Sequence, residues 1–181
     1  MITMKYARSL YWLLLATTVG FFVVLSFWYV PKLTVVVNGT VLRPFDLLLF
    51  GYTPQDAKLY LSALSPEQIE MYKDQMLAID RIFPILYAST WVIALLWLNR
   101  GAWGWVFSVA ILAGAVFDYL ENAAFTQMLT TDPASLADSV VINASHWTVL
   151  KFISFSICIF GFLILLFLFL YDRFRRIPKS G

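Results

Sequence analysis

The residues most able to do chemistry in this chain lie within one short segment, 117–122 (Phe-Asp-Tyr-Leu-Glu-Asn). It carries two carboxylates and a carboxamide, Asp118, Glu121 and Asn122, inside a run that otherwise predicts a membrane-spanning helix. An ionisable side chain at membrane depth costs about 2.5–3.5 kcal/mol on insertion scales, so two of them this close together require an explanation. Because positions i, i+3 and i+4 share one helix face, the three side chains point the same way. We take this face as the centre of the predicted site.

The composition predicts a membrane protein. Of the 181 residues, 61 % are hydrophobic and 13 % are charged, whereas a soluble domain has roughly 45–50 % apolar and about 25 % charged residues. A helix needs about 20 apolar residues to cross the hydrocarbon core. The runs that are long enough are 9–30, 79–98, 102–125 and 146–171. We therefore expect an all-α integral membrane protein with a single membrane domain, a bundle of four transmembrane helices.

The distribution of Lys and Arg predicts the orientation of this bundle. With four spans, one side of the membrane receives Lys5, Arg8, Arg100, Arg173, Arg175, Arg176 and Lys179. The positive-inside rule makes that side the cytoplasm, so both termini are expected there. The protein would then be a multi-pass membrane protein, in the inner membrane if its source is bacterial.

The long connection 31–78 predicts a small cap on the extracytoplasmic side. Residues 33–37 and 40–42 are rich in β-branched side chains, and they flank the dipeptide Asn38-Gly39. Asn-Gly between two such runs is the typical sequence of a type I′ turn, so a short β-hairpin is expected. If the chain has a protein partner, this cap is the surface at which we expect it to bind.

The rest of the cap predicts one or two amphipathic helices. Thr53 and Ser65 are each followed by proline, the typical start of a helix, and Gln68 would complete a capping box at Ser65. No helix breaker follows at once, so the second of these helices is expected to run on to residue 98. The apolar segment 45–50 is expected to lie on the membrane surface or to line the roof of a cavity.

Counting along the helices places other polar residues at the depth of the central segment. At 1.5 Å per residue, Asp118 lies about 24 Å from the cytoplasmic end of its span, and Asp80 lies about 28 Å from that of the second. Lys151 lies only about 7 Å into the fourth span from the outer side. The residues expected in this one layer are Asp80, Arg81, Asp118, Glu121, Asn122, His146 and Lys151.

Helical phase indicates what lies on the cytoplasmic side of this layer. Tyr87 recurs on the face of Asp80, two turns further along the second span. On the third span Ala110 and Gly114 continue the stripe of Asp118. Small residues at this spacing let helices pack closely, or else they leave room for a ligand.

The layer of charges supports three hypotheses. In the first, the protein binds, and in the stronger form also transforms by acid–base chemistry, a small amphipathic or lipid-like molecule, with Asp118 and Glu121 as the catalytic groups. The second is a non-catalytic accessory or assembly subunit whose buried charges fix helix register. The third is a cation- or proton-coupled carrier, which would need polar residues toward the cytoplasmic side, where the spans have very few. The ligand contacts of the first hypothesis are Asp80, Arg81, Tyr87, Asn122, His146 and Lys151.

Other classes of site are not indicated. A formal charge of +2 is too small to indicate nucleic-acid binding. The single cysteine, Cys158, and the single histidine, His146, exclude a thiolate or histidine-rich metal site within one chain. The sequence also lacks the motifs of phosphate-binding loops, zinc proteases, serine hydrolases and Cys-x-x-Cys proteins. We therefore expect no metal and no cofactor, and the sequence leaves open whether the protein is an enzyme.

The layout of the chain resembles that of the EXPERA-type four-helix membrane proteins. The resemblance rests on the span order, the long first outer loop, and Asp80 shortly before Phe83-Pro84 and Tyr87. That family includes sterol isomerases and sterol-binding proteins with carboxylates in a membrane cavity, so the resemblance implies such a cavity here. The segment 117–122 matches no motif of the family, and no catalytic residue is transferred from it.

Overall fold

A computed structural model describes residues 2–175, and the side chains of residues 6–175. Two basic residues used above to predict orientation, Arg176 and Lys179, lie outside the described residues. Within them, four helices are long and apolar enough to cross a membrane: Tyr6–Leu33, Pro66–Leu98, Ala102–Thr130 and Asp138–Arg175. The chain is thus a helical, multi-pass membrane protein, as the composition predicts. Each helix extends beyond the predicted apolar run, because its hydrogen bonds continue into the polar flanks.

The two N-terminal long helices are interrupted and the two C-terminal ones are regular. The first contains a π-helical segment, η1, and the second contains another, η3, followed by a turn before α6. In chain order, the helical elements are α1 (Ile2–Val23), η1 (Val24–Tyr29), α2 (Val30–Leu33), η2 (Phe45–Leu47), α3 (Pro54–Ala63), α4 (Pro66–Glu70), η3 (Met71–Met76), α5 (Leu77–Asp80), α6 (Phe83–Leu98), α7 (Ala102–Thr130) and α8 (Asp138–Arg175).

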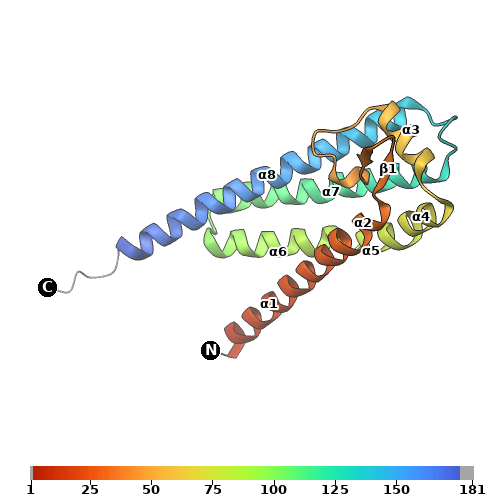
Figure 1. Cartoon of the computed structure of the whole chain (residues 1–181). Helices are drawn as coiled ribbons and strands as arrows, with labels where there is room; N and C mark the ends of the chain where they lie inside the picture. Colours follow the sequence, from red (N-terminus) through yellow and green to blue (C-terminus); the bar gives the residue numbers. More distant parts are fainter. Residues whose placement is uncertain (1, 176–181) are drawn as a thin grey trace.

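Helices α6, α7 and α8 run side by side, whereas α1 leans away from them toward its N-terminal end (Figure 1). Helices α7 and α8 approach closely at Gly114, where an added Cβ would lie 3.2 Å from the Cβ of Ser154. Gly161 of α8 likewise lies directly against the ring of Phe107. Gly114, one turn before Asp118 on α7, therefore allows close helix packing and leaves no room for a ligand.

Of the predicted cap 31–78, residues 34–65 fold over one end of the bundle, and the name cap is used for them from here on (Figure 1). Residues 31–33 and 66–78 belong instead to the first and second long helices. Strands β1 (Val35–Val37) and β2 (Thr40–Leu42) form an antiparallel hairpin. Asn38 and Gly39 both have positive φ, as a type I′ turn requires. Capping boxes begin α3 and α4, so the predicted hairpin and both predicted helix starts are confirmed.

Two clusters of buried apolar side chains stabilise this arrangement. One lies under the cap and includes Phe45, Tyr72 and Phe125. The other lies between α6, α7 and α8 and includes Leu95 and Ile111. The buried charged residues lie between the two clusters, at the level where the cap meets the bundle. The end of α1 and the end of α8 that carry the termini lie at the opposite end of the molecule (Figure 1).

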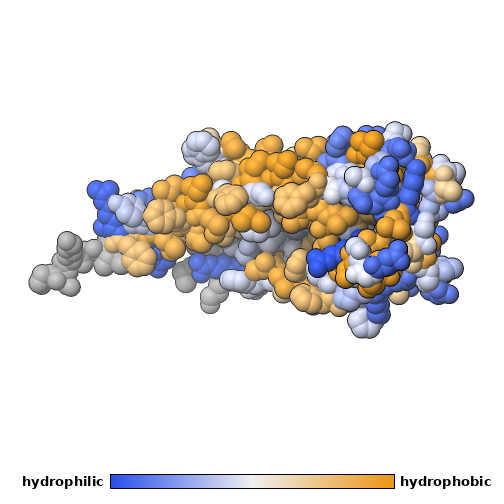
Figure 2. All heavy atoms as spheres, turned by 45° about the horizontal axis from the view of Figure 1, so that its top comes forward, coloured by the Kyte–Doolittle hydropathy of each residue, from blue (hydrophilic) through white to orange (hydrophobic). Residues whose placement is uncertain are grey.

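The outer surface has the polarity of a membrane protein. Hydrophobic side chains cover the middle length of the helices, and hydrophilic ones gather at the ends, most of all around the cap (Figure 2). An apolar belt of this kind matches the hydrocarbon core of a bilayer, whose thickness is about 30 Å.

Candidate functional site

The predicted site residues that face the bundle interior come together where α5, α6, α7 and α8 meet. The side chains are almost completely enclosed, with at most 7 % of each residue exposed. The residues in this cluster are Asp80, Tyr87, Asp118, Glu121, Asn122 and Lys151. Interior positions were predicted by helical phase, and the structure brings these six together from separate helices.

Lys151 links α8 to the acidic face of α7. Its Nζ donates a hydrogen bond to Asp118 Oδ1 at 3.3 Å and another to Glu121 Oε2. Glu121 also accepts a hydrogen bond from the hydroxyl of Thr148, one turn earlier on α8. A buried ammonium is tolerated only when it is paired and hydrogen-bonded, and here two carboxylates provide both.

The hydrogen bonds of the other three members, Asp80, Tyr87 and Asn122, link the second long helix to α7. Tyr87 Oη donates to Asp118 Oδ2 at 3.0 Å, and Asn122 Nδ2 donates to Asp80 Oδ2 at 2.9 Å. Asp118 is therefore bonded through both oxygens, whereas Asp80 receives a single donor. The carboxamide predicted as a ligand contact acts here as a hydrogen-bond donor to an acid.

Two predicted site residues do not join the cluster. Arg81 and His146 are both exposed on the outside of the bundle. The depth estimate was sound, but neighbouring positions on a helix point about 100° apart, so a residue beside Asp80 cannot share its direction. On α8 the inward face is formed by Ser145, Thr148 and Lys151, which turns His146 outward.

Sequence reasoning missed one member of the site, Asp46. The cap brings this residue of η2 to the cluster, where its Oδ2 accepts a 3.0 Å hydrogen bond from Tyr72. Its buried Oδ1 has no hydrogen-bond partner among the described residues. Burial raises the pKa of the Asp46 carboxyl, although Lys151 and the Tyr72 hydroxyl oppose the shift. The signal in the sequence was a single acid within the apolar segment 45–50.

With Asp46 added and Arg81 removed, the charge balance changes. Four carboxyl groups now lie around one ammonium group, that of Lys151. Full ionisation would leave three negative charges unmatched in a region of low dielectric constant, which is strongly unfavourable. The cluster must therefore hold protons, or it must receive hydrogen-bond donors or positive charge from a bound molecule.

A cavity of about 360 Å³ opens beside the cluster. Its polar wall consists of Asp46, Asp80, Asp118 and Lys151, while Glu121 does not line it. The other lining side chains come mainly from η1, α6 and α8, and most are apolar or aromatic. The cavity is thus polar at the cap and apolar elsewhere.

A second cavity, of about 470 Å³, continues the first between α1, α6 and α8. The two cavities share five lining residues: Phe22, Phe83, Tyr87, Phe155 and Ile159. The second is lined almost entirely by apolar and aromatic side chains, and its threonines, Thr18 and Thr90, hydrogen-bond each other at 2.9 Å. Together the cavities form one groove, which we call the α1–α8 groove, with its carboxyl groups at one end.

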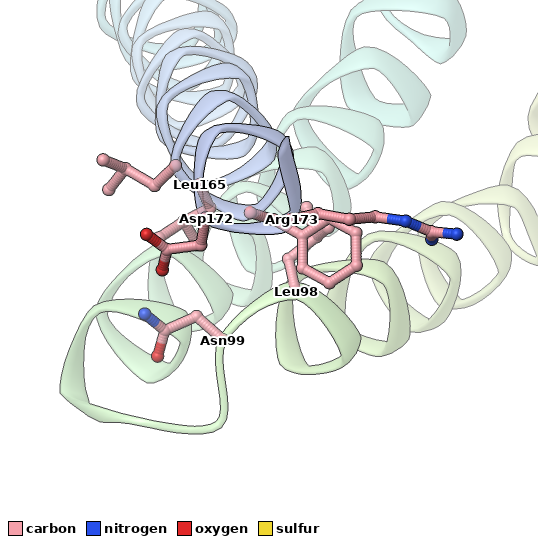
Figure 3. A pocket seen from close by; sticks show the side chains of 7 residues that line it. Leu98, Asn99, Leu165, Asp172 and Arg173 are labelled. Atoms are coloured by element: carbon pink, nitrogen blue, oxygen red, sulfur yellow. The ribbon is translucent and has the colours of Figure 1, made fainter. Parts of the chain in front are cut away.

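A further cavity, of about 400 Å³, lies at the opposite end of the bundle, where α6 and α8 end. Asp172 and Asn99 point toward each other across it, and Arg173 points away (Figure 3). This cavity is separate from the buried cluster and contains none of its residues, so it does not enter the candidate site.

The chain matches no protein-family model, no curated protein and no solved structure at a significant level. The resemblance to EXPERA-type proteins therefore stays one of layout. Among the residues that the structure describes, no group of His, Cys, Asp or Glu side chains is arranged to hold a metal ion. Function must be inferred from the geometry of the cluster and its groove.

Proposed function

We propose that this protein binds one amphipathic, lipid-like molecule in the α1–α8 groove. The polar group of the ligand would lie against Asp46, Asp80 and Asp118, and its apolar part would lie along Phe155 and Ile159. The observation that carries the proposal is the polarity of the groove, which has buried carboxyl groups at one end and apolar walls along the rest.

The carboxyl groups would determine which ligand binds. For a molecule that comes from the bilayer, burying an apolar chain gains little, because lipid is as apolar as the groove. A hydrogen bond in a medium of low dielectric constant is stronger than in water, and an unpaired buried oxygen is costly. Asp46 Oδ1 has no hydrogen-bond partner within the described part of the chain, so a head group that donates hydrogen bonds is favoured.

We further propose that the ligand reaches the groove from within the membrane. Phe22 and Ile159 line the groove and are also exposed on the outer surface, where lipid would surround them. In this proposal the cap faces the extracytoplasmic side and both termini are cytoplasmic. If the source is bacterial, the membrane is the inner membrane.

Proton transfer is the chemistry that such a site could add to binding. Of the two acids predicted as catalytic, Asp118 lines the cavity, whereas Glu121 is engaged by Lys151 and Thr148. Asp80, which also lines the cavity, receives only one hydrogen bond. Asp80 and Asp118 are therefore the groups that would exchange a proton with a ligand.

One alternative function also has an observation in its favour. The three-way contact of Lys151 with Asp118 and Glu121 would fix the register of α7 and α8 without any ligand, as in an accessory or assembly subunit whose cap binds a partner. A carrier is less well supported. Toward the termini, the buried polar groups between the helices are the hydroxyls of Thr18, Thr90, Ser108 and Ser154, and none of the described residues buried there is charged.

The proposal is tested by photolabelling the purified protein in dodecyl maltoside micelles. The probes are three C16 amphiphiles with a diazirine beside an ammonium, a carboxylate or a hydroxyl head group. We expect at least one probe to label α6 or α8 in the groove saturably, with competition by its unlabelled parent compound. The preferred head group then identifies the ligand class.

A pair of variants provides the control. Ile159→Trp places an indole in the groove and should reduce labelling about tenfold, the equivalent of 1.4 kcal/mol. Leu163→Trp adds the same ring one turn further along α8, at an exposed position outside the groove, and should leave labelling unchanged. Absence of saturable labelling by any probe, or equal labelling of the two variants, would leave the accessory-subunit hypothesis in place.

A further inference from the structure

The loop that follows η2 presents an unusual apolar tip. Phe50 is 98 % exposed, more than any other large hydrophobic side chain among the described residues, and its neighbour Leu49 is exposed as well. Scattered single hydrophobic residues on a surface need no explanation, but adjacent ones on a loop do. No charged residue lies between 47 and 53, and the nearest acid, Asp46, turns inward to the cluster.

This tip is held in a fixed position against α8. The amide of Gly51 donates to the Leu48 carbonyl at 2.8 Å, and the amide of Tyr52 donates to Ser145 Oγ at 2.8 Å. Gly51 has φ +82°, and a Cβ on it would lie 2.6 Å from Ser145 Oγ. Only glycine fits this close turn, so the loop directs Leu49 and Phe50 outward.

The tip lies at the level of the membrane-spanning part of α8. Leu49 and Phe50 line one apolar groove together with Val149, Phe152 and Ile153 of α8, and the groove continues along the helix to Phe160. In Figure 1 the connection between β2 and α3 lies alongside α8. Exposed side chains of α8 at this level belong to the apolar belt that lipid would cover. The tip is continuous with that surface.

We propose that Leu49 and Phe50 insert into the cap-side leaflet of the bilayer and anchor the cap to the membrane. The occupant of the apolar groove beside the tip is then lipid hydrocarbon. Asp46 and Leu47, which directly precede the tip, line the cavity at the buried cluster. The anchor would therefore hold the roof of that cavity at the membrane surface. This inference does not depend on which ligand binds, or on whether one does.

Spin labelling tests the depth of the tip. Phe50→Cys is made in a Cys158→Ala background, so that a nitroxide attaches at one site, and the protein is placed in phosphatidylcholine–phosphatidylglycerol vesicles. The collision rate of the nitroxide with oxygen, which concentrates in lipid, is compared with its collision rate with a water-soluble nickel chelate. We expect the oxygen-to-nickel accessibility ratio at position 50 to exceed that at a water-exposed site several-fold.

Two matched positions calibrate the measurement. Leu163→Cys, on an exposed part of α8 outside the groove beside the tip, should report lipid, and Val36→Cys on the exposed face of the hairpin should report water. A label at position 50 that behaves like the one at Val36 would overturn the proposal. Protection of position 50 from both reagents would overturn it too, because a protein partner or a second copy would then cover the tip.

Discussion

Lys151 shows how tightly single residues are coupled in the buried cluster. Its ammonium group is shared by Asp118 and Glu121, so its loss would leave two carboxyl groups buried without a cation. We expect Lys151→Met to lower the free energy of unfolding by about 3–5 kcal/mol, the usual cost of breaking a buried ion pair. Denaturant titration in mixed micelles, followed by tryptophan fluorescence, provides the measurement.

The double variant Lys151→Met, Glu121→Gln completes this test. Removing Glu121 together with Lys151 takes away part of the unpaired charge. The decreases in the free energy of unfolding caused by the two single substitutions should therefore not add. We expect the double variant to be more stable than additivity predicts by about 1–3 kcal/mol. Strict additivity would mean that Lys151 and Glu121 are not coupled, contrary to the contact between them.

Asp46 makes the stability depend on pH in an unusual direction. Because burial raises its pKa, the folded state holds a proton that the unfolded chain releases. Below the ordinary aspartate pKa, the Asp46 carboxyl does not change the free energy of unfolding. As the pH rises above that value, it lowers the free energy of unfolding, and this effect levels off above the folded-state pKa. Asp46→Asn, whose carbonyl can still accept the Tyr72 hydrogen bond, should therefore gain stability relative to wild type as the pH rises.

Between the ordinary aspartate pKa and the folded-state pKa, the stability of Asp46→Asn relative to wild type rises by at most about 1.4 kcal/mol per pH unit, as expected for one proton. Melting temperatures of both proteins in detergent, measured from pH 4 to about pH 8, give the difference directly. Subtracting the two curves leaves the pH dependence that Asp46 adds, both by its own titration and through its charge interactions with the neighbouring acids. A difference that stays flat with pH would show that Asp46 titrates as it does in the unfolded chain.

At the residue scale, sequence reasoning was correct about depth and incomplete about direction. Asp118, Glu121 and Lys151 face one another because helical phase and depth agree for them. Arg81 and His146 satisfy the depth estimate but lie on outward faces. Asp46 could not be placed from local sequence, because its position depends on how the cap docks on the bundle.

At the scale of elements, the two π-helical segments lie where the first and second long helices pass the cavity. Leu25 and Ser26 of η1 and Met76 of η3 all line it. A π-helical turn widens a helix and redirects its side chains, and such turns are frequent at functional sites. No local sequence signal predicts them, so they were missed, whereas the helix starts at Thr53 and Ser65 follow from short-range capping and were predicted.

The turn between α6 and α7 depends on one glycine. A Cβ on Gly104 would overlap the carbonyl oxygen of Asn99, so Gly104→Ala must displace backbone and should lower the free energy of unfolding by about 1–3 kcal/mol. Gly20 in α1 has open space around it, and Gly20→Ala should be neutral or stabilising by up to about 1 kcal/mol. Melting temperatures of the two variants in detergent give the comparison, and equal stability would contradict the crowding at Gly104.

At the scale of the whole molecule, hydropathy alone predicted the helix number and order, because each helix must bury its backbone hydrogen bonds across the membrane. The hairpin was predictable because a two-residue turn determines it locally. The docking of the cap was not, since it depends on contacts distant in sequence, such as the hydrogen bond from Tyr60 of α3 to the Leu33 carbonyl.

Charge divides the molecule into two unlike ends and predicts its orientation. The end opposite the cap carries Arg8, Arg100, Arg173 and Arg175, while Asp172 is the single acid there among the described residues. Basic residues beside short loops are retained in the cytoplasm.

We therefore expect Val36→Cys in the cap to react with a membrane-impermeant maleimide on intact spheroplasts of a bacterial host. Ala102→Cys, beside the α6–α7 turn, should react only after the membrane is opened, with Cys158→Ala as background in both. The reverse pattern would place the cap in the cytoplasm and the basic end outside.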